Sequence, residues 1–272
     1  MSTARSAWIE GIALWAPRLP DWATARAVLS QRAPAPAATA RPTPAMLPAN
    51  ERRRASDTVA LALEAATRAC ESAGRDPSTL ASVFSCTHGD LVISDYMCRT
   101  LAEAPETISP TRFHNSVHNA PSGYWSIGTQ CRAASTALTA WHYTFGAGLL
   151  EALVQTACSG QPVLYVAYDI EARPPMAPQS PSRGLLAAAL VLASAASPHS
   201  RHRLEWQVQV ADASTATRMQ SINRPLVEGN AMRTCLPLYE ALATGDQRPL
   251  RIALAAHQVL DLQLTPCPEP RA

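Results

Sequence analysis

The chain has 272 residues and a formal net charge of +2, and all 23 of its basic residues are arginine. At this length roughly three quarters of the unfolded surface can be buried, so one large domain or two smaller ones are both compatible with it. The small net charge gives no electrostatic bias toward nucleic acid or a membrane surface. No apolar run reaches the roughly 18 to 20 residues that a membrane span needs, and we expect no membrane span.

The cysteines are spread widely, and no two of them form a Cys-x-x-Cys pair. A dispersed, odd-numbered set is typical of reduced thiols and not of a disulfide framework or a zinc site. Residues 1–5 lead directly into an apolar, strand-like stretch, which does not resemble a signal peptide. We therefore expect a cytoplasmic protein with no metal and no cofactor.

A first strand is expected at residues 7–14, and a segment rich in proline and alanine follows at 33–48. Its prolines exclude a continuous helix or a central strand, so we interpret it as a surface loop. Asn50 stands at the N-cap position of a helix expected to run from residue 51 to residue 73. Gly74 is a typical helix terminator.

Strands and helices alternate through the rest of the chain. Residues 163–167 form a continuous apolar run of the kind that is buried on both faces, whereas residues 185–196 fit a strand or a helix equally. The other expected strands are residues 81–86, 135–139, 204–210 and 250–256, and the other expected helices are residues 90–102, 145–156 and 229–243. This alternation indicates an α/β fold with a layered sheet.

The run from Ile108 to Gly123, with Asn119-Ala120-Pro121-Ser122-Gly123 at its end, resembles the stretch that precedes the active-site strand of β-ketoacyl synthases. In that family the nucleophilic cysteine stands about nineteen residues beyond such a turn, and the position nineteen residues beyond Gly123 is His142. The helix that follows, the turn at Gly160 and the apolar strand after it keep the family's spacing. More narrowly, Ser116-Val117-His118-Asn119-Ala120 resembles the ketosynthase-like proteins of aryl polyene clusters. Those proteins are regarded as chain-length-factor-like companions of an active ketosynthase.

The resemblance implies a thiolase-like, layered α-β-α fold with a shortened C-terminal half. We expect a single ketosynthase-like domain, residues 1–272, in which residues 7–195 correspond to the N-terminal half of a ketosynthase and residues 196–272 to a truncated C-terminal half. The turn after the second strand, Ser85-Cys86-Thr87-His88-Gly89-Asp90, fits the same family pattern.

Two departures from the family argue against catalysis by this chain alone. His142 stands where a decarboxylative ketosynthase needs a thiolate to carry the acyl chain, and an acyl-imidazole hydrolyses readily. The family also uses two histidines of the C-terminal half on the malonyl thioester, but His202 and His257 lack the corresponding His-Gly-Thr-Gly-Thr setting. The resemblance therefore implies a non-catalytic, chain-length-factor-like subunit that shapes the acyl tunnel of an active β-ketoacyl synthase in aryl polyene biosynthesis.

A catalytic alternative stays open. Residues 126–131 imitate the motif that ends the active-site strand of true ketosynthases, so Cys131 is a second candidate nucleophile, although this alignment displaces the following helix and strand. His142 is a relic of the old nucleophile pocket, a contact to a partner, or a catalytic base that Asp169 or Glu151 orients. With Cys131 or His142 as the reacting group, the chain would be a small acyltransferase or thioesterase.

The resemblance also assigns surfaces. Thiolase-like proteins pair through the strand that leads into the nucleophile. The expected partner in this pairing is an active ketosynthase, and a homodimer is the alternative. An acyl carrier protein is the second expected partner. The residues expected at the partner interface are Phe113, Trp125, Ser135, Thr136, Ala137, Leu138 and Thr139. The residues expected to line an acyl tunnel are Val92, Ile93, Tyr96 and Met97, with Tyr96 as the gate that limits chain length.

Other polar residues have two interpretations each. Arg52-Arg53-Arg54 is either the solvated start of a helix or a docking patch for an acidic carrier protein. His114 and His118 could share a helix face and bind a metal, but the sequence offers no obvious third ligand, and buried, hydrogen-bonded histidines are the simpler interpretation. Asn119 is expected to satisfy backbone groups in a tight turn.

Overall fold

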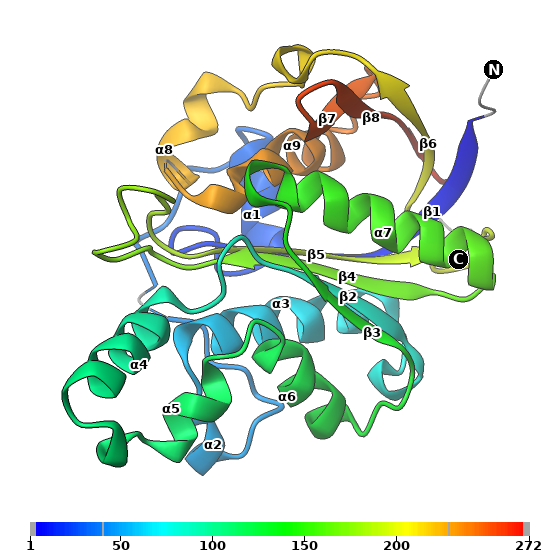
Figure 1. Cartoon of the computed structure of the whole chain (residues 1–272). Helices are drawn as coiled ribbons and strands as arrows, with labels where there is room; N and C mark the ends of the chain where they lie inside the picture. The colour runs from blue at the N-terminus through cyan, green and yellow to red at the C-terminus, as the bar shows by residue number, and fades with distance from the viewer. Residues whose placement is uncertain (1–3, 40, 228, 269–272) are drawn as a thin grey trace.

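The structure is a computed structural model that describes residues 4–39, 41–227 and 229–268. Its centre is one mixed sheet in the strand order β3-β2-β4-β5-β1-β6-β8-β7 (Figure 1). The strands are β1 (Arg5–Trp15), β2 (Ala81–Ser85), β3 (Ser135–Leu138), β4 (Val163–Asp169), β5 (Leu186–Ala193), β6 (His202–Val210), β7 (Leu250–Ala255) and β8 (Gln258–Pro266).

Helices cover both faces of this sheet. In Figure 1, α1, α7 and α9 lie on one face, whereas α3 and α6 lie on the other, with α4 and α5 beside them. The α-helices are α1 (Trp22–Leu29), α2 (Ala49–Arg54), α3 (Asp57–Ala73), α4 (Leu91–Glu103), α5 (Pro110–Asn115), α6 (Ala120–Thr129), α7 (Thr144–Ser159), α8 (Arg224–Val227) and α9 (Leu236–Thr244). The result is the layered α-β-α arrangement that the alternation of strands and helices predicts.

Strands β2, β3 and β4 run parallel, so their carboxyl ends meet at one edge of the sheet. Ser85, at the end of β2, pairs with Leu138 on one side and with Ala167 on the other. The turns that follow these strands therefore come together, and in open α/β sheets this is the edge where functional sites form.

The core lies on both sides of β4 and β5, which are buried along their whole length. Tyr165 and Ala167 belong to the apolar cluster that includes α7 and α9, whereas Val166 and Tyr168 belong to the cluster that includes α3. Burial on both faces explains why residues 163–167 are apolar without interruption, as predicted.

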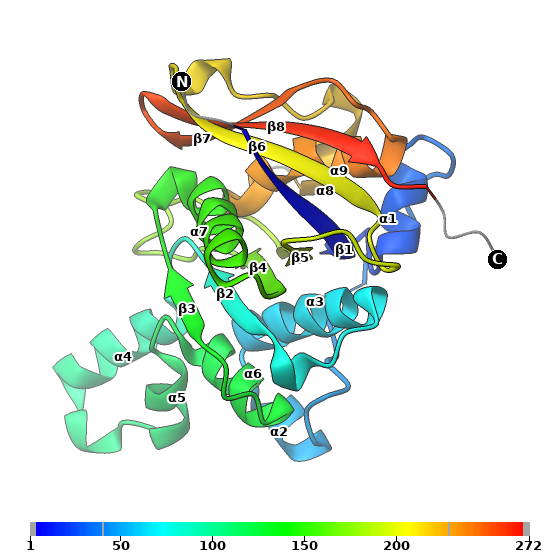
Figure 2. The same cartoon turned by 90° about the vertical axis from the view of Figure 1, so that its right-hand side faces the viewer.

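The C-terminal strands continue the sheet in antiparallel fashion, with β6 beside β1, β8 beside β6 and β7 beside β8. Figure 2 shows β3 and β7 at opposite edges of the sheet. Residues of β7 and β8 share a core cluster with α9. This short meander follows the β1–β5 part of the sheet, and the assignment of residues 196–272 as a truncated C-terminal half stays a prediction.

Four sequence-based expectations for this fold were wrong or incomplete. The helix expected from residue 229 to residue 243 is a 3-10 helix, η6 (Ala231–Cys235), followed by α9, which begins only at Leu236. The helix expected from residue 51 to residue 73 is broken at Ala55, whose backbone is extended, and Ser56 caps α3 by accepting a hydrogen bond from Val59 N. Asn50 lies inside α2 and does not cap it. The tight turn expected at Asn119 is the start of α6, and the Asn119 side chain makes no capping bond.

The segment at residues 185–196 contains strand β5. Its periodicity fitted a strand and a helix equally, and its pairing with β4 and β1 shows that it is a strand. Helices α1, α5, α6 and α8 and strand β8 have no counterpart among the expected elements. In the part of the chain that the structure describes, none of the helices combines the length and the apolar character that crossing a bilayer requires.

Candidate functional site

The turn between β3 and α7 carries the residues that the sequence singles out. Residues 141–143 form a short 3-10 helix, η3, in which Trp141 has a left-handed φ of 54°. The hydroxyl of Thr144 accepts a hydrogen bond from Ala140 N at 3.0 Å and donates to the Trp141 carbonyl at 2.7 Å. A bulky residue in this conformation is strained, and such strain gathers at functional sites. The turn leaves the side chains of Trp141 and His142 exposed.

The imidazole of His142 is held by its neighbour. Trp141 Nε1 donates a hydrogen bond to His142 Nε2 at 2.5 Å, and the two rings meet edge to face. Because an indole N–H can only donate, His142 Nε2 is the acceptor in this contact. The carboxylates considered as its orienting groups are engaged elsewhere, since Glu151 accepts from Gln155 and Asp169 accepts from Thr87.

Helix α7 lies close to the sheet because it presents glycines to it. A Cβ on Gly148 would stand 2.7 Å from the ring of Tyr165 and 2.8 Å from the side chain of Ser85. A Cβ on Gly146 would stand 2.4 Å from the carbonyl oxygen of Ala253. These contacts hold the head of α7 between β2, β4 and β7.

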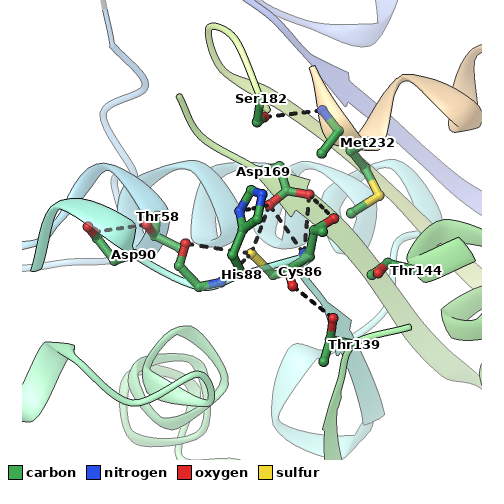
Figure 3. A network of polar contacts seen from close by, with 12 residues as sticks. Thr58, Cys86, His88, Asp90, Thr139, Thr144, Asp169, Ser182 and Met232 are labelled. Atoms are coloured by element: carbon green, nitrogen blue, oxygen red, sulfur yellow. Dashed lines mark hydrogen bonds and ion pairs between the residues drawn. The ribbon is translucent and has the colours of Figure 1, made fainter. Parts of the chain in front are cut away.

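A buried polar network lies at the ends of β2 and β4 (Figure 3). Asp169 is 0% exposed and accepts hydrogen bonds from Thr87 N at 3.2 Å, Thr87 Oγ1 at 2.6 Å and Cys86 Sγ at 3.2 Å. His88 Nδ1 lies 3.4 Å from the same carboxylate. Burial raises the pKa of Asp169, in spite of these hydrogen bonds.

The thiol in this network, that of Cys86, is completely buried. Burial, and after it the Asp169 charge, raises the pKa of Cys86 well above its usual value. Burial likewise raises the pKa of Cys70 to about 12. A thiol with a raised pKa carries almost no thiolate at neutral pH and is chemically inert.

The network fastens the turn at residues 86–90 to its surroundings. His118 Nε2 lies 2.8 Å from the Cys86 carbonyl oxygen, and Thr139 Oγ1 donates to the Thr87 carbonyl at 2.8 Å. Thr58 Oγ1 donates to Asp90 Oδ2 at 3.0 Å, which ties the turn to α3. The His118 ring is thus hydrogen-bonded but only half-buried, and the exposed ring of His114 packs against Tyr124, so the expectation of two buried histidines was wrong.

Cys131 lies at the other end of the parallel strands. It is buried in the connection between α6 and β3, and its Sγ donates to the Leu80 carbonyl, just before β2, at 3.3 Å. His142 follows β3 at its carboxyl end. The structure therefore separates the two candidate reacting groups and leaves the head of α7 to His142.

The residues expected to line a tunnel lie on α4, but not all of them line a cavity. Val92, Ile93 and Tyr96 line a cavity of about 550 Å³, whereas Met97 is buried and does not line it. The Tyr96 hydroxyl accepts from Ser109 N at 3.2 Å, and the Arg112 guanidinium lies 4.0 Å from its ring centroid. Arginine and aspartate side chains form much of the remaining wall.

Only some of the residues expected at the partner interface are exposed or belong to β3. The side chain of Phe113 is 61% exposed on α5, but that of Trp125 is 1% exposed and packs near Phe84, so Trp125 is a core residue. Thr139 follows β3 and does not belong to it. On its outer side, β3 has no strand beside it in the described ranges, so residues 135–138 form a sheet edge.

One feature beside His142 was missed by the sequence analysis. A cavity of about 490 Å³ is lined by His142 and by residues of the segment 213–224, η6 (Ala231–Cys235) and β7. Arginines from several of these segments converge on it. These arginines are far apart in the sequence and belong to no motif. The sequence therefore did not indicate the cavity.

Comparison with known proteins identifies the family. The family model described as "Beta-ketoacyl synthase, N-terminal domain" matches residues 22–250, so the chain belongs to this family. No curated protein matches it in sequence.

Solved structures share the fold at low identity. A chain of the ketosynthase ApeO in complex with its chain length factor ApeC, from Xenorhabdus doucetiae, matches with a TM-score of 0.70 and 22% identity over 97% of this chain and 100% of that chain. A chain of AntDE:AntF, a type II acyl carrier protein in complex with its ketosynthase bound to the hexaketide, matches with a TM-score of 0.72 and 13% identity over 97% and 99% of the two chains. A chain of the ishigamide ketosynthase/chain length factor matches with a TM-score of 0.71 and 12% identity over 96% and 99%. The predicted thiolase-like, ketosynthase-type fold is confirmed.

Proposed function

We propose that this chain is a non-catalytic, chain-length-factor-like subunit that pairs with an active β-ketoacyl synthase and shapes the tunnel for the growing acyl chain. The observation that carries the proposal is the head of α7, where His142, hydrogen-bonded to Trp141, lies at the position that the resemblance assigns to the nucleophile. Without a thiolate at this position the chain has no group there to hold an acyl chain as a thioester. The partner must then form the carbon–carbon bond.

The open edge of β3 supports the pairing. An unpaired edge strand is a template for another chain, and proteins normally cover it. Exposed apolar side chains also occur on α5 and α6, namely Phe113 at 61% and Ile127 at 76%, and α6 contacts β3. Pairing β3 with the corresponding strand of a ketosynthase would cover this edge, and obligate interfaces bury on the order of 2,000 Å² or more.

The solved complexes support the choice of partners. Two of them contain a ketosynthase with a chain length factor, and one contains a ketosynthase with an acyl carrier protein. We extend these partners to the present chain, with an aryl polyene or related polyketide chain as the product.

Co-expression with a full-length β-ketoacyl synthase from the same organism tests the proposal. We expect a one-to-one heterodimer that makes product from malonyl-loaded carrier protein, while each subunit alone makes none. The variant His142→Ala should leave product formation intact, since a residue with no chemical role can be removed. Product formed by this chain alone, or lost in His142→Ala while the heterodimer still assembles, would overturn the proposal.

The same preparation examines the acyltransferase or thioesterase alternative. Hydrolysis or transfer of an acyl thioester by this chain alone, abolished by Cys131→Ala or His142→Ala, would establish it. The buried position of Cys131, hydrogen-bonded to the Leu80 carbonyl, predicts no such activity.

A further inference from the structure

The cavity beside His142 lies where the N-terminal and C-terminal parts of the chain meet. Helix α7 contacts η6, and η3 contacts β7, so its walls come from both parts. Helix α8 lies on the same side of the sheet as α7 (Figure 1). At about 490 Å³, the cavity has the size of an ordinary small-molecule site.

The charge in this cavity is one-sided. Arg218, Arg224, Arg233 and Arg251 line it, and Arg251 is neutralised by Asp261 at 3.0 Å. For the other three arginines the described ranges contain no ion pair, and no described carboxylate lines the cavity. Arg224 and Arg233 also line an adjoining cavity of about 380 Å³. Guanidinium groups gathered in a concave surface without acidic partners favour an anion.

Three guanidinium groups with no ion pair among the described residues favour a phosphate over a carboxylate. A carboxylate carries one negative charge, whereas a phosphate monoester carries close to two and offers three oxygens to planar guanidinium forks. Hydroxyls of Ser214, Thr217, Ser221 and Thr234 also line the cavity and can donate to such oxygens.

The part of the cavity wall away from the arginines indicates which chemical group the ligand carries besides the phosphate. Ala213, Ala216, Met219, Pro237, Ile252 and Ala253 give the cavity an apolar side. A bare phosphate would leave this side uncovered. The geometry fits a phosphate at the arginines with an uncharged arm along the apolar wall, near His142.

We infer that this cavity binds an organic phosphate monoester, with Arg224 and Arg233 holding the phosphate. The site does not depend on subunit pairing, so its failure would leave the proposed function untouched.

Calorimetric titration of the full-length chain with phenyl phosphate, inorganic phosphate and benzoate tests the inference. Phenyl phosphate should bind in a saturable, salt-sensitive manner and more tightly than either of the others. Because a hydrogen bond from a charged group is lost, Arg224→Gln and Arg233→Gln should each weaken its binding about ten-fold or more. Arg203→Gln is the control, since Arg203 pairs with Glu205 on β6 and does not line the cavity.

The imidazole proton signals of His142 should shift on addition of phenyl phosphate, which places the arm near η3. Thermal unfolding of each variant establishes that it is folded. The inference is wrong if phenyl phosphate shows no saturable binding, if benzoate binds as tightly, or if Arg203→Gln weakens binding as much as Arg233→Gln.

Discussion

Glu10 is completely buried in β1, and its carboxylate is nevertheless stabilised in the charged form. Arg75 donates to it through Nε and Nη2, both at 2.8 Å, and the Ser197 hydroxyl donates as well. Burial acts to raise the pKa of Glu10, but these hydrogen bonds outweigh it and hold the pKa below the usual 4.5. The pair connects β1 to the segment after α3.

Glu10→Gln should lower the free energy of unfolding at pH 7 on the order of 2 kcal/mol, because a buried ion pair is broken. Since the folded-state pKa is lowered, the contribution is fully present above pH 4.5 and is lost as the pH falls through the folded-state pKa. Denaturant unfolding at pH 7 and below pH 4 measures both effects. Glu205→Gln, at an exposed pair with Arg203, should cost less than about 1 kcal/mol, and an equal loss in both variants would contradict the account.

Tyr96 is held from two sides, by Ser109 N and by the Arg112 guanidinium, and it faces the cavity on α4. A bulky side chain at this point would stop chain extension by occupying space. In a reconstituted heterodimer, Tyr96→Ala should shift the products toward longer polyenes, while Tyr96→Phe, which keeps the ring, should not. Product masses decide this, and an unchanged length in Tyr96→Ala would remove Tyr96 as the gate.

At the scale of elements, the position of α7 depends on the absence of a side chain at Gly148. Its Cβ would overlap Tyr165 and Ser85, so Gly148→Ala should lower the free energy of unfolding by about 1–3 kcal/mol through overpacking. Gly123, in α6, has open space around its Cβ position. Gly123→Ala should therefore stabilise the helix by about 0.5–1 kcal/mol. Thermal or denaturant unfolding compares the stabilities of the two variants. Equal changes in the free energy of unfolding would show that close packing at Gly148 does not hold α7.

A substitution in β3 can test the pairing of the two subunits without removing a hydrogen bond between β3 and β2. Ser82 N donates to the Ala134 carbonyl and Cys86 N donates to the Leu138 carbonyl, so alternate residues of β3 face β2 and Ala137 faces the open edge. Ala137→Pro removes a backbone donor on that edge only. It should abolish the heterodimer in size-exclusion chromatography, whereas Ala137→Val, which keeps the donor, should not. A heterodimer that survives Ala137→Pro would place the interface elsewhere.

The elements that could be predicted from the sequence are those whose burial leaves a local trace. Residues 163–167 are apolar because both faces of β4 are covered, and Gly74 ends α3 because a left-handed residue is required there. Spacing alone placed His142 before the helix that begins at Thr144. The break at Ser56 was missed because the helical periodicity continues on both sides of it.

At the scale of the whole molecule, the contacts that sequence reasoning could not supply are those between distant segments. Asp169 was considered as a partner of His142, but the parallel order of β2 and β4 brings it to Thr87 and Cys86 instead. Arg224 and Arg233 line a cavity together with His142 only because η6 and β7 pack against α7. Trp125 is buried because residues 120–129 form a helix against α3, where a turn was expected.

If another subunit carries the acyl chain, intact-protein mass spectrometry of the heterodimer after incubation with acyl-loaded carrier protein will locate that chain. We expect an acyl adduct on the ketosynthase partner, lost when the nucleophilic cysteine of that partner is replaced by alanine, and no mass increase on this chain. An acyl adduct on this chain, located at Cys131 or His142, would contradict this expectation.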